Sequence, residues 1–309
     1  IPGSSINLVY QTTHKEYEQI HEGCDALIKR SGEQLFKKDD NSFVLVNTLS
    51  YTWKGAICLP ESFHGYSLLD QNGEVIQLQN DGNGILAAVE LDPLSFTTFK
   101  KGNKADLENN KSEDLVLEND LIKYEFDQTG QLISMYDKVL DKEFLSNSGN
   151  VLSLYEDRPN NWDAWDVDFF YREALIETAK ATKVEALANG EVTKQIMLSF
   201  SIGGSSVEQL VSLYPHSKRL DFATHVEWNE KHKMLRVHFP VSIRSEQATF
   251  DIQYGYVKRN THRNTSWDKA KFEVVGHKYA DLSDHDHGVA LMNDCKYGYM
   301  VHDNILDLN

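Results

Sequence analysis

The chain has 309 residues, of which 40% are hydrophobic and 25% are charged, so it is long enough to bury a large core. Its 47 acidic and 31 basic residues give a net charge of −16, which would repel a nucleic-acid backbone, and no basic stripe offsets it. No run approaches the roughly 20 apolar residues that a membrane helix requires. Neither a nucleic acid nor a membrane is therefore an expected partner.

The cysteines and the first residues bear on the cellular compartment. Cys24, Cys58 and Cys295 are odd in number and far apart, so they indicate neither a disulfide framework nor a zinc knuckle. Isolated cysteines of this kind are usually small buried hydrophobes. The N-terminus has neither the basic start nor the apolar centre of a secretory signal. These features favour a reducing, cytoplasmic location.

The first predicted element is a helix over residues 13–36, with charged residues on one face. Its apolar residues recur at spacings of three and four: Tyr17, Ile20, Cys24, Leu27 and Ile28. Thr13 stands three residues before Glu16, a spacing that predicts a capping box. One helix cannot bury its own apolar stripe, so we expect the chain to begin partway through a larger protein.

From residue 42 the hydrophobic pattern has a period of two. Short runs such as "FVLVNTLS", "KQIMLSFSIG", "MLRVHFPVSI" and "TFDIQYGYV" are typical of strands, and turn sequences such as Gln-Thr-Gly separate many of them. More than about ten strands without intervening helices predict stacked antiparallel sheets, that is, a large β-sandwich. "SIGGSS", residues 201–206, is expected to be a hairpin turn.

Composition also suggests where the domains divide. Residues 100–114, "KKGNKADLENNKSED", are polar and resemble a linker. We therefore expect a small β-subdomain over residues 41–105 and the main sandwich over residues 106–309. The final "GYMVHDNILDLN" predicts a hairpin whose second strand stops in mid-course, so the main domain is expected to be truncated at its C-terminus.

The nearest approach to a metal cluster is "DLSDHDHG", residues 281–288. Ligands one residue apart on a strand would point to opposite faces, and a turn is the more natural setting for Asp, His and Gly. A zinc site also needs further ligands that this sequence does not place. We expect no metal site in this chain, and we find no nucleophile elbow, phosphate-binding glycine loop or dinucleotide fingerprint.

Two segments combine tryptophan with many polar residues. In "YEDRPNNWDAWDVDFFYRE", residues 155–173, an indole ring could lie against a pyranose face while carboxylates accept hydrogen bonds from hydroxyl groups. We favour a sugar-binding function here, and the predicted substrate-binding residues are Asn161, Trp162, Asp163, Trp165 and Asp166. For "RNTHRNTSWDKAKFE", residues 259–273, we favour a structural role, as a loop tied by hydrogen bonds and pinned by one buried tryptophan. The predicted loop-supporting residues are Arg158, Arg263, Trp267 and Asp268.

These motifs carry a family resemblance. "EDRPNNWDAWDVDFFYRE", "RNTHRNTSWDKAKFE" and "GVALMNDCKYGY" together resemble the C-terminal half of family 38 glycoside hydrolases, the retaining α-mannosidases, in the branch with cytosolic and many bacterial members. "LENDLIKYEFDQTGQLISMYDK" is similar to the strand pair that opens the main β-domain of that family. The resemblance covers nearly everything from about residue 42 onward. It implies a mutarotase-like supersandwich, and it implies that residues 1–40 end a helical bundle.

The resemblance also implies where the chemistry lies. The family begins with a β/α barrel that carries a zinc ion and the aspartate nucleophile, and the zinc-binding motif is not in this chain. The catalytic residues and zinc ligands would then lie upstream, so this chain alone should be inactive and bind no zinc. Its partners would be its own catalytic barrel and a mannose-containing glycan. Trp162 or Trp165 would stack on a sugar, Asp163 and Asp166 would bind its hydroxyls, and Arg158 would pair with a carboxylate.

Two other interpretations stay open at this stage. The sandwich could be a non-catalytic carbohydrate-binding module, or a structural domain whose tryptophans belong to the core, since the fold alone does not decide function. The exposed edges of so many strands also make a homo-oligomer plausible.

Overall fold

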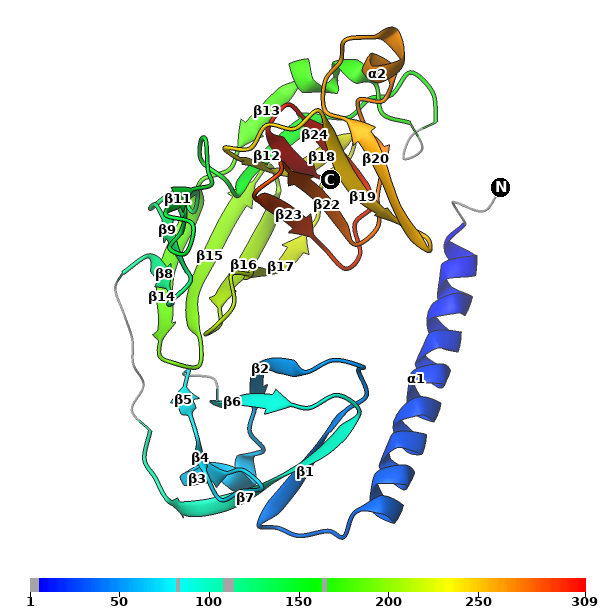
Figure 1. Cartoon of the computed structure of the whole chain (residues 1–309). Helices are drawn as coiled ribbons and strands as arrows, with labels where there is room; N and C mark the ends of the chain where they lie inside the picture. The colour runs from blue at the N-terminus through cyan, green and yellow to red at the C-terminus, as the bar shows by residue number, and fades with distance from the viewer. Residues whose placement is uncertain (1–5, 82–83, 108–113, 163–165) are drawn as a thin grey trace. The chain divides into compact units, whose positions relative to one another are not determined.

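The computed structural model describes residues 6–81, 84–107, 114–162 and 166–309 (Figure 1). The chain divides into two units. The smaller unit comprises Ile1–Gln77 with Ala87–Asp106, and the larger unit comprises Leu78–Leu86 with Leu107–Asn309. In the described part of the chain, no helix is long and apolar enough to cross a membrane.

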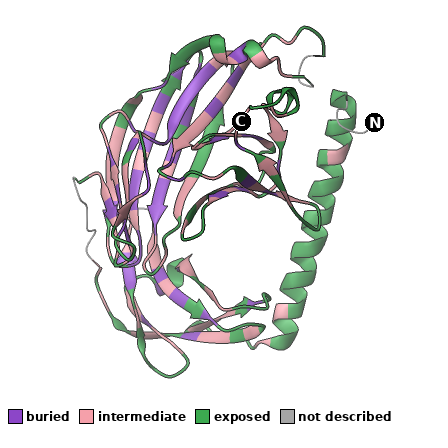
Figure 2. Ribbon diagram, turned by 45° about the horizontal axis from the view of Figure 1, so that its top comes forward, coloured by how far each residue is buried: buried purple, intermediate pink, exposed green. Residues whose placement is uncertain are grey.

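The long helix of the smaller unit, α1 (Asn7–Leu35), confirms the predicted helix but begins six residues before Thr13. The predicted capping box is wrong, because the N-cap residue is Ile6, its side chain makes no capping bond, and Thr13 lies inside the helix. No residue of α1 is buried, and Figure 2 shows it exposed along nearly its whole length. Its apolar stripe, including Ile20 and Ile28, is therefore accessible in this structure.

The rest of the smaller unit is a four-stranded sheet in the order β1-β7-β3-β4, together with β2, the main part of β6 and one turn of 3-10 helix. The bounds are β1 (Ser42–Asn47), β2 (Trp53–Cys58), η1 (Glu61–Phe63), β3 (Tyr66–Leu69), β4 (Val75–Ile76), β6 (Ile85–Leu91) and β7 (Ser95–Lys104). Phe43 packs its ring 4.9 Å from that of Phe63 and 5.4 Å from that of Phe99. Strand β7 reaches Lys104, so the first residues of the expected linker are strand.

The larger unit holds four sheets, all of them antiparallel, which confirms the predicted mostly β sandwich (Figure 1). Two of them have the orders β11-β10-β9-β8 and β14-β15-β16-β17. Their strands are β8 (Val116–Glu118), β9 (Ile122–Phe126), β10 (Leu132–Asp137), β11 (Lys142–Glu143), β14 (Ala181–Asn189), β15 (Lys194–Ile202), β16 (Ser205–Leu213) and β17 (Leu220–Glu227). The predicted turn between β15 and β16 is confirmed, with Gly203 at a φ of 59°.

The other two sheets have the orders β13-β12-β18-β25-β24-β21 and β20-β19-β22-β23. Their strands are β12 (Val151–Glu156), β13 (Leu175–Thr178), β18 (Lys233–Pro240), β19 (Gln247–Ile252), β20 (Gly255–Asn260), β21 (Val274–Val275), β22 (Tyr279–Ser283), β23 (Gly288–Met292), β24 (Gly298–His302) and β25 (Ile305–Leu308). Strand β25 forms the predicted hairpin with β24 and also pairs with β18. The short β5 (Leu78–Asn80), η2 (Phe169–Glu173) and α2 (Ser266–Ala270) complete the unit.

Two predictions at residue level are corrected. "TFDIQYGYV" is the hairpin β19–β20 rather than one strand, and Tyr254 at its turn has a φ of 61°. The three cysteines are free and exposed, not buried. The regular polar alternation of such segments identifies strands but does not show where a chain reverses.

The strand alternation of β18 explains how the sandwich carries a polar site. Successive residues of a strand point to opposite faces, so Leu235 and Val237 lie on one face and Arg236 and His238 on the other. Leu235 and Val237 pack against the main apolar core, which also contains Leu154 and Ile196. The opposite face holds the polar side chains Arg236, which is fully buried, and His238, which is partly buried.

Candidate functional site

The first tryptophan segment, residues 155–173, connects β12 to β13 through η2. Trp162 is 77% exposed and has a left-handed backbone, with a φ of 66°. Its carbonyl accepts a hydrogen bond from the Asp166 backbone N–H at 3.1 Å. Asn161 and Asp166 are exposed, while Asp163 and Trp165 lie outside the described residues. The Trp162 ring is thus accessible beside polar groups, and the sugar-binding role of these residues stays a prediction.

The predicted supporting residue Arg158 lies at the start of this segment. Its Nε is 2.8 Å from Oε1 of Glu156, and both side chains are substantially exposed. An exposed ion pair of this kind stabilises by about 1 kcal/mol at most. Arg158 therefore contributes little stability of its own, and a stronger anchor for the segment lies elsewhere.

That anchor is a buried polar network beneath η2. Tyr171 is 4% exposed, its ring lies edge-on to Tyr155 at 5.4 Å, and its hydroxyl donates to Oε1 of Glu273 at 2.5 Å. Arg236 is only 1% exposed. Its Nη1 donates to Glu273 at 3.1 Å and its Nε donates to Asp307 at 2.7 Å. One guanidinium thus joins η2, β18 and β25.

The protonation states of the network follow from its contacts. Burial alone would lower the pKa of Arg236, but Asp307 and Glu273 outweigh that effect and raise it. Burial, with a contribution from the Glu273 carboxylate, raises the pKa of Tyr171. At neutral pH the guanidinium is therefore charged and the phenol is a neutral donor. His238 has a lowered pKa because of burial and because of Arg236 nearby.

The second tryptophan segment, residues 259–273, follows β20 and contains α2. Asp268 accepts hydrogen bonds from the Asn260 amide at 2.9 Å and from the Thr265 hydroxyl at 2.6 Å. Thr265 caps α2, because its Oγ1 accepts the Asp268 backbone N–H at 3.1 Å. Trp267 is 78% exposed, so the expectation of a buried tryptophan that pins this loop is wrong. Local polar contacts hold the loop.

The structure brings the two segments together. The Phe169 ring lies 5.2 Å from the Phe272 ring, edge to face. The Arg263 guanidinium is 5.6 Å from the Phe169 ring, and the Lys269 ammonium is 5.0 Å from it. Arg263, which we predicted to support a loop, thus contacts the neighbouring segment through an aromatic ring.

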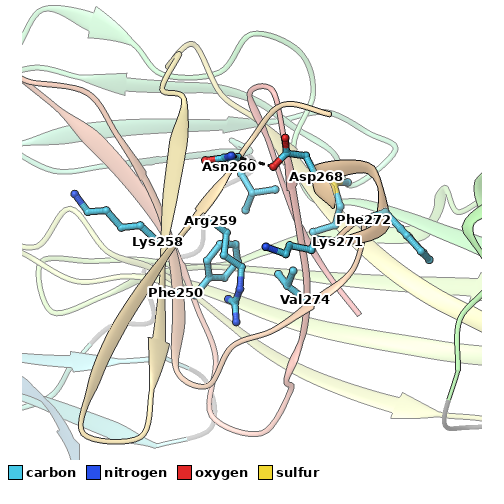
Figure 3. Close-up of a pocket in the computed structure, with 10 residues that line it drawn as sticks. Phe250, Lys258, Arg259, Asn260, Asp268, Lys271, Phe272 and Val274 are labelled. Atoms are coloured by element: carbon cyan, nitrogen blue, oxygen red, sulfur yellow. Dashed lines mark hydrogen bonds between the residues drawn. The ribbon is translucent and has the colours of Figure 1, made fainter. Parts of the chain in front are cut away.

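A pocket opens beside the second segment, with a volume of about 110 Å³ (Figure 3). Six of its ten lining residues belong to residues 259–273 or follow directly in β21. The lining residues are Phe250, Lys258, Arg259, Asn260, Asp268, Lys271, Phe272, Val274, Met300 and Val301. The lining therefore combines basic residues, among them Arg259 and Lys271, with apolar ones.

The Asp-His segment forms the predicted turn, between β22 and β23. His287 Nδ1 lies 3.0 Å from Oδ1 of Asp284, which also accepts two backbone N–H groups. Among the residues that the structure describes, no group of three or more His, Cys, Asp and Glu side chains could hold a metal ion. The resemblance implies zinc ligands upstream of this chain, so no chemical step is assigned to a metal here.

Sequence reasoning missed the buried polar network of Tyr171, Arg236, Glu273 and Asp307. A usable signal is present in "MLRVHFP", where Arg236 lies between the apolar residues Leu235 and Val237. Charged residues are almost never fully buried unless they are paired, so such a position predicts a buried partner. The pattern does not identify that partner.

Comparison with known proteins gives the family. Residues 117–309 match the glycosyl hydrolases family 38 C-terminal domain. The match covers more than half of the chain, and the chain therefore belongs to this family. The predicted family resemblance is confirmed.

The relatives that match the chain are α-mannosidases. The chain is 31% identical to α-mannosidase G of Dictyostelium discoideum over 349 residues, which cover 97% of this chain and 32% of that protein. It is 31% identical to human α-mannosidase 2C1 over 316 residues, which cover 100% of this chain and 29% of that protein. The chain thus spans about a third of the length of these relatives.

A solved structure shows the same fold. The α-mannosidase from Enterococcus faecalis V583 superposes with a TM-score of 0.75 over 98% of this chain and 44% of that chain. Its sequence identity is 16%, so this similarity supports the fold alone.

Proposed function

We propose that this chain is part of an α-mannosidase that hydrolyses terminal α-linked mannose from glycans with retention of configuration. The observation that carries the proposal is the identity of 31% to two α-mannosidases over essentially the whole chain. A retaining glycosidase uses two carboxyl groups, one as nucleophile and one as acid and base. We infer that these groups, and a zinc ion, belong to a catalytic barrel outside these 309 residues.

The role proposed for this chain is to support that barrel and to shape the substrate site. Trp162 would lie against a sugar face, and Asn161 and Asp166 would bind hydroxyl groups. The buried contacts of Tyr171 would hold the segment in place at its base. Correct placement of a substrate strongly affects the rate, so such a segment can influence turnover without performing chemistry.

The primary test is hydrolysis of an aryl α-mannoside by the longer protein, with and without a zinc chelator. We expect activity that chelation removes, and no activity from the 309-residue chain alone. Proton NMR should show the α-anomer of mannose as the first product, since a double displacement retains configuration. A folded, zinc-loaded protein that cleaves no α-mannoside would contradict the proposal.

The tryptophans offer a matched pair of variants, because Trp162 and Trp267 are 77% and 78% exposed. We expect Trp162→Ala to lower kcat/KM about tenfold, equivalent to about 1.4 kcal/mol of transition-state stabilisation. Trp267→Ala should leave kcat/KM near the wild-type value, and neither change should shift Tm appreciably. Equal losses in both variants would remove the special role of Trp162.

A carbohydrate-binding module that does not cleave is the second candidate function. The exposed rings of Trp162 and Trp267 favour it, because aromatic faces suit the apolar faces of sugars. Saturable binding of a mannose disaccharide by the 309-residue chain, without hydrolysis by the longer protein, would support this alternative over the first.

We also propose a cytoplasmic location. Three free and exposed cysteines suit a reducing compartment, where thiols persist.

A further inference from the structure

The pocket of Figure 3 carries more positive charge than its one carboxylate balances. Lys258, Arg259 and Lys271 line it, together with Asp268. Asp268 is already bound by Asn260 and Thr265. Within the described part of the chain, none of the three basic side chains makes an ion pair with a carboxylate. This is unexpected in a protein with a net charge of −16.

Arg259 has unused hydrogen-bonding capacity. Its guanidinium lies 4.7 Å from the centre of the Phe250 ring, which covers one face of the group. Its Nη1 is buried and has no hydrogen-bond partner. Burial lowers the pKa of Arg259, and no nearby carboxylate opposes that effect. A guanidinium presents its N–H groups along its edge, so a ligand in the pocket can accept them there.

Figure 3 separates the roles of the two lysines. The Lys271 ammonium points toward the Arg259 side chain. The Lys258 ammonium points away from Arg259 and from Lys271. Lys258 also lines a second hollow, with the acidic residues Asp281 and Asp284. An anion held between the Arg259 guanidinium and the Lys271 ammonium would attract both groups.

We propose that this pocket binds a phosphate group, with Arg259 and Lys271 as its ligands. Arg259 can donate two parallel hydrogen bonds to phosphate oxygens, and Lys271 adds a point charge. The volume of about 110 Å³ is several times the roughly 10–15 Å³ that a cavity needs to hold one water, so a four-oxygen anion fits. The phosphate is either inorganic or a phosphate ester of a sugar. This site does not depend on the proposed hydrolysis of mannosides.

The site is tested by isothermal titration calorimetry of the full chain with inorganic phosphate. Phosphate replaces chloride in the buffer, so that the ionic strength stays constant. We expect saturable binding that Arg259→Gln weakens about tenfold or more, since it loses charge-assisted hydrogen bonds. Lys271→Gln should weaken it several-fold, and because Lys271 is exposed this change should not disturb folding. Lys258→Gln is the control and should bind like the wild type.

Three results would overturn the site: no saturable phosphate binding, full binding by Lys271→Gln, or equal losses in Lys258→Gln and Lys271→Gln. The source of the group is resolved by titration with mannose 6-phosphate and with mannose. Tighter binding of the ester than of inorganic phosphate indicates a sugar phosphate, whereas binding of inorganic phosphate alone indicates the free ion. Binding of mannose equal to that of its phosphate would contradict a phosphate site.

Discussion

Two loops of the larger unit each expose a tryptophan, but they are held in different ways. The Trp162 loop, residues 157–168, leads into η2, and its anchor is the buried contact of Tyr171 with Glu273. The Trp267 loop, residues 261–270, is closed by hydrogen bonds around Asp268 that span at most eight residues. The first loop therefore leads into a buried charged network. The second is held by its own hydrogen bonds and by backbone and hydroxyl bonds at its start, where Thr261 bonds Ser245 and Asp303.

This difference indicates how each loop should respond to substitution. The network under the Trp162 loop joins residues that are 71 and 102 positions apart, so a change in β18 can reach the loop. The Trp267 loop has no comparable buried ion pair among its described contacts. A loop anchored in the core suits a site that must place a ligand accurately.

The largest effect should come from Arg236→Ala. This change leaves Asp307 buried without its cation and removes one of the two cations beside Glu273, which keeps Arg172 at 3.6 Å. We therefore expect the free energy of unfolding to fall by about 3–5 kcal/mol. Urea unfolding at pH 7 measures the loss. The exposed Arg244 provides a control, since Arg244→Ala should change stability by less than about 0.5 kcal/mol. Equal stability of the two variants would show that the network is not the anchor.

A smaller effect is expected from Tyr171→Phe, which keeps the ring and removes the hydroxyl that donates to Glu273. One hydrogen bond to a charged group contributes about 1.5–3 kcal/mol, and we expect a loss near the lower end because Glu273 keeps Arg236 as a partner. Thermal unfolding measures it. Tyr155→Phe, at the neighbouring ring, should have little effect, and the comparison fails if Tyr155→Phe costs as much.

The fold was largely predictable because strand alternation is local. "MLRVHFP" alternates, and it forms β18. The start of α1 was not predictable from Thr13, because a helix continues through a potential capping residue when the preceding residues, here Asn7 to Thr12, also permit helix. The strands β14 and β16 were absent from the predicted runs, since polar residues break their apolar alternation. In β14 Thr182 and Lys183 are consecutive, and in β16 the buried face carries Ser205 and Gln209.

The site was only partly predictable. Local composition singled out the segments around Trp162 and Trp267, and the structure brings these segments together through Phe169 and Phe272. The partners of Arg236 lie on other strands, and pairing across 71 residues leaves no local signature. The exposure of Trp267 could not be predicted either, because the residue type alone does not decide whether a tryptophan in a loop is buried.

The Trp267 loop should respond weakly to loss of its cap. Thr265→Ala removes the acceptor for the Asp268 backbone N–H, so we expect a loss of about 0.5–1 kcal/mol, near the low end for N-caps because α2 is short and exposed. Chemical unfolding measures it, with Ser266→Ala as the control. A loss as large as that of Arg236→Ala would mean that the Trp267 loop is also anchored in the core.

The smallest effect should be the contribution of His238, beside Arg236, to the pH dependence of stability. His238 has a folded-state pKa that burial and Arg236 lower below the usual value of about 6.5. As pH falls from 7 to 5, the unfolded chain therefore binds a proton at this residue before the folded chain does, and the free energy of unfolding decreases. Unfolding measured at several pH values should show a shallower decrease in His238→Gln than in the wild type. Thr265→Ala should keep the wild-type slope from pH 7 to 5, because the carboxyl group that Thr265 bonds, Asp268, has a pKa lowered below the usual aspartate value of about 3.9. If His238→Gln keeps that slope as well, the acid sensitivity arises outside the network and the two loops do not differ in this respect.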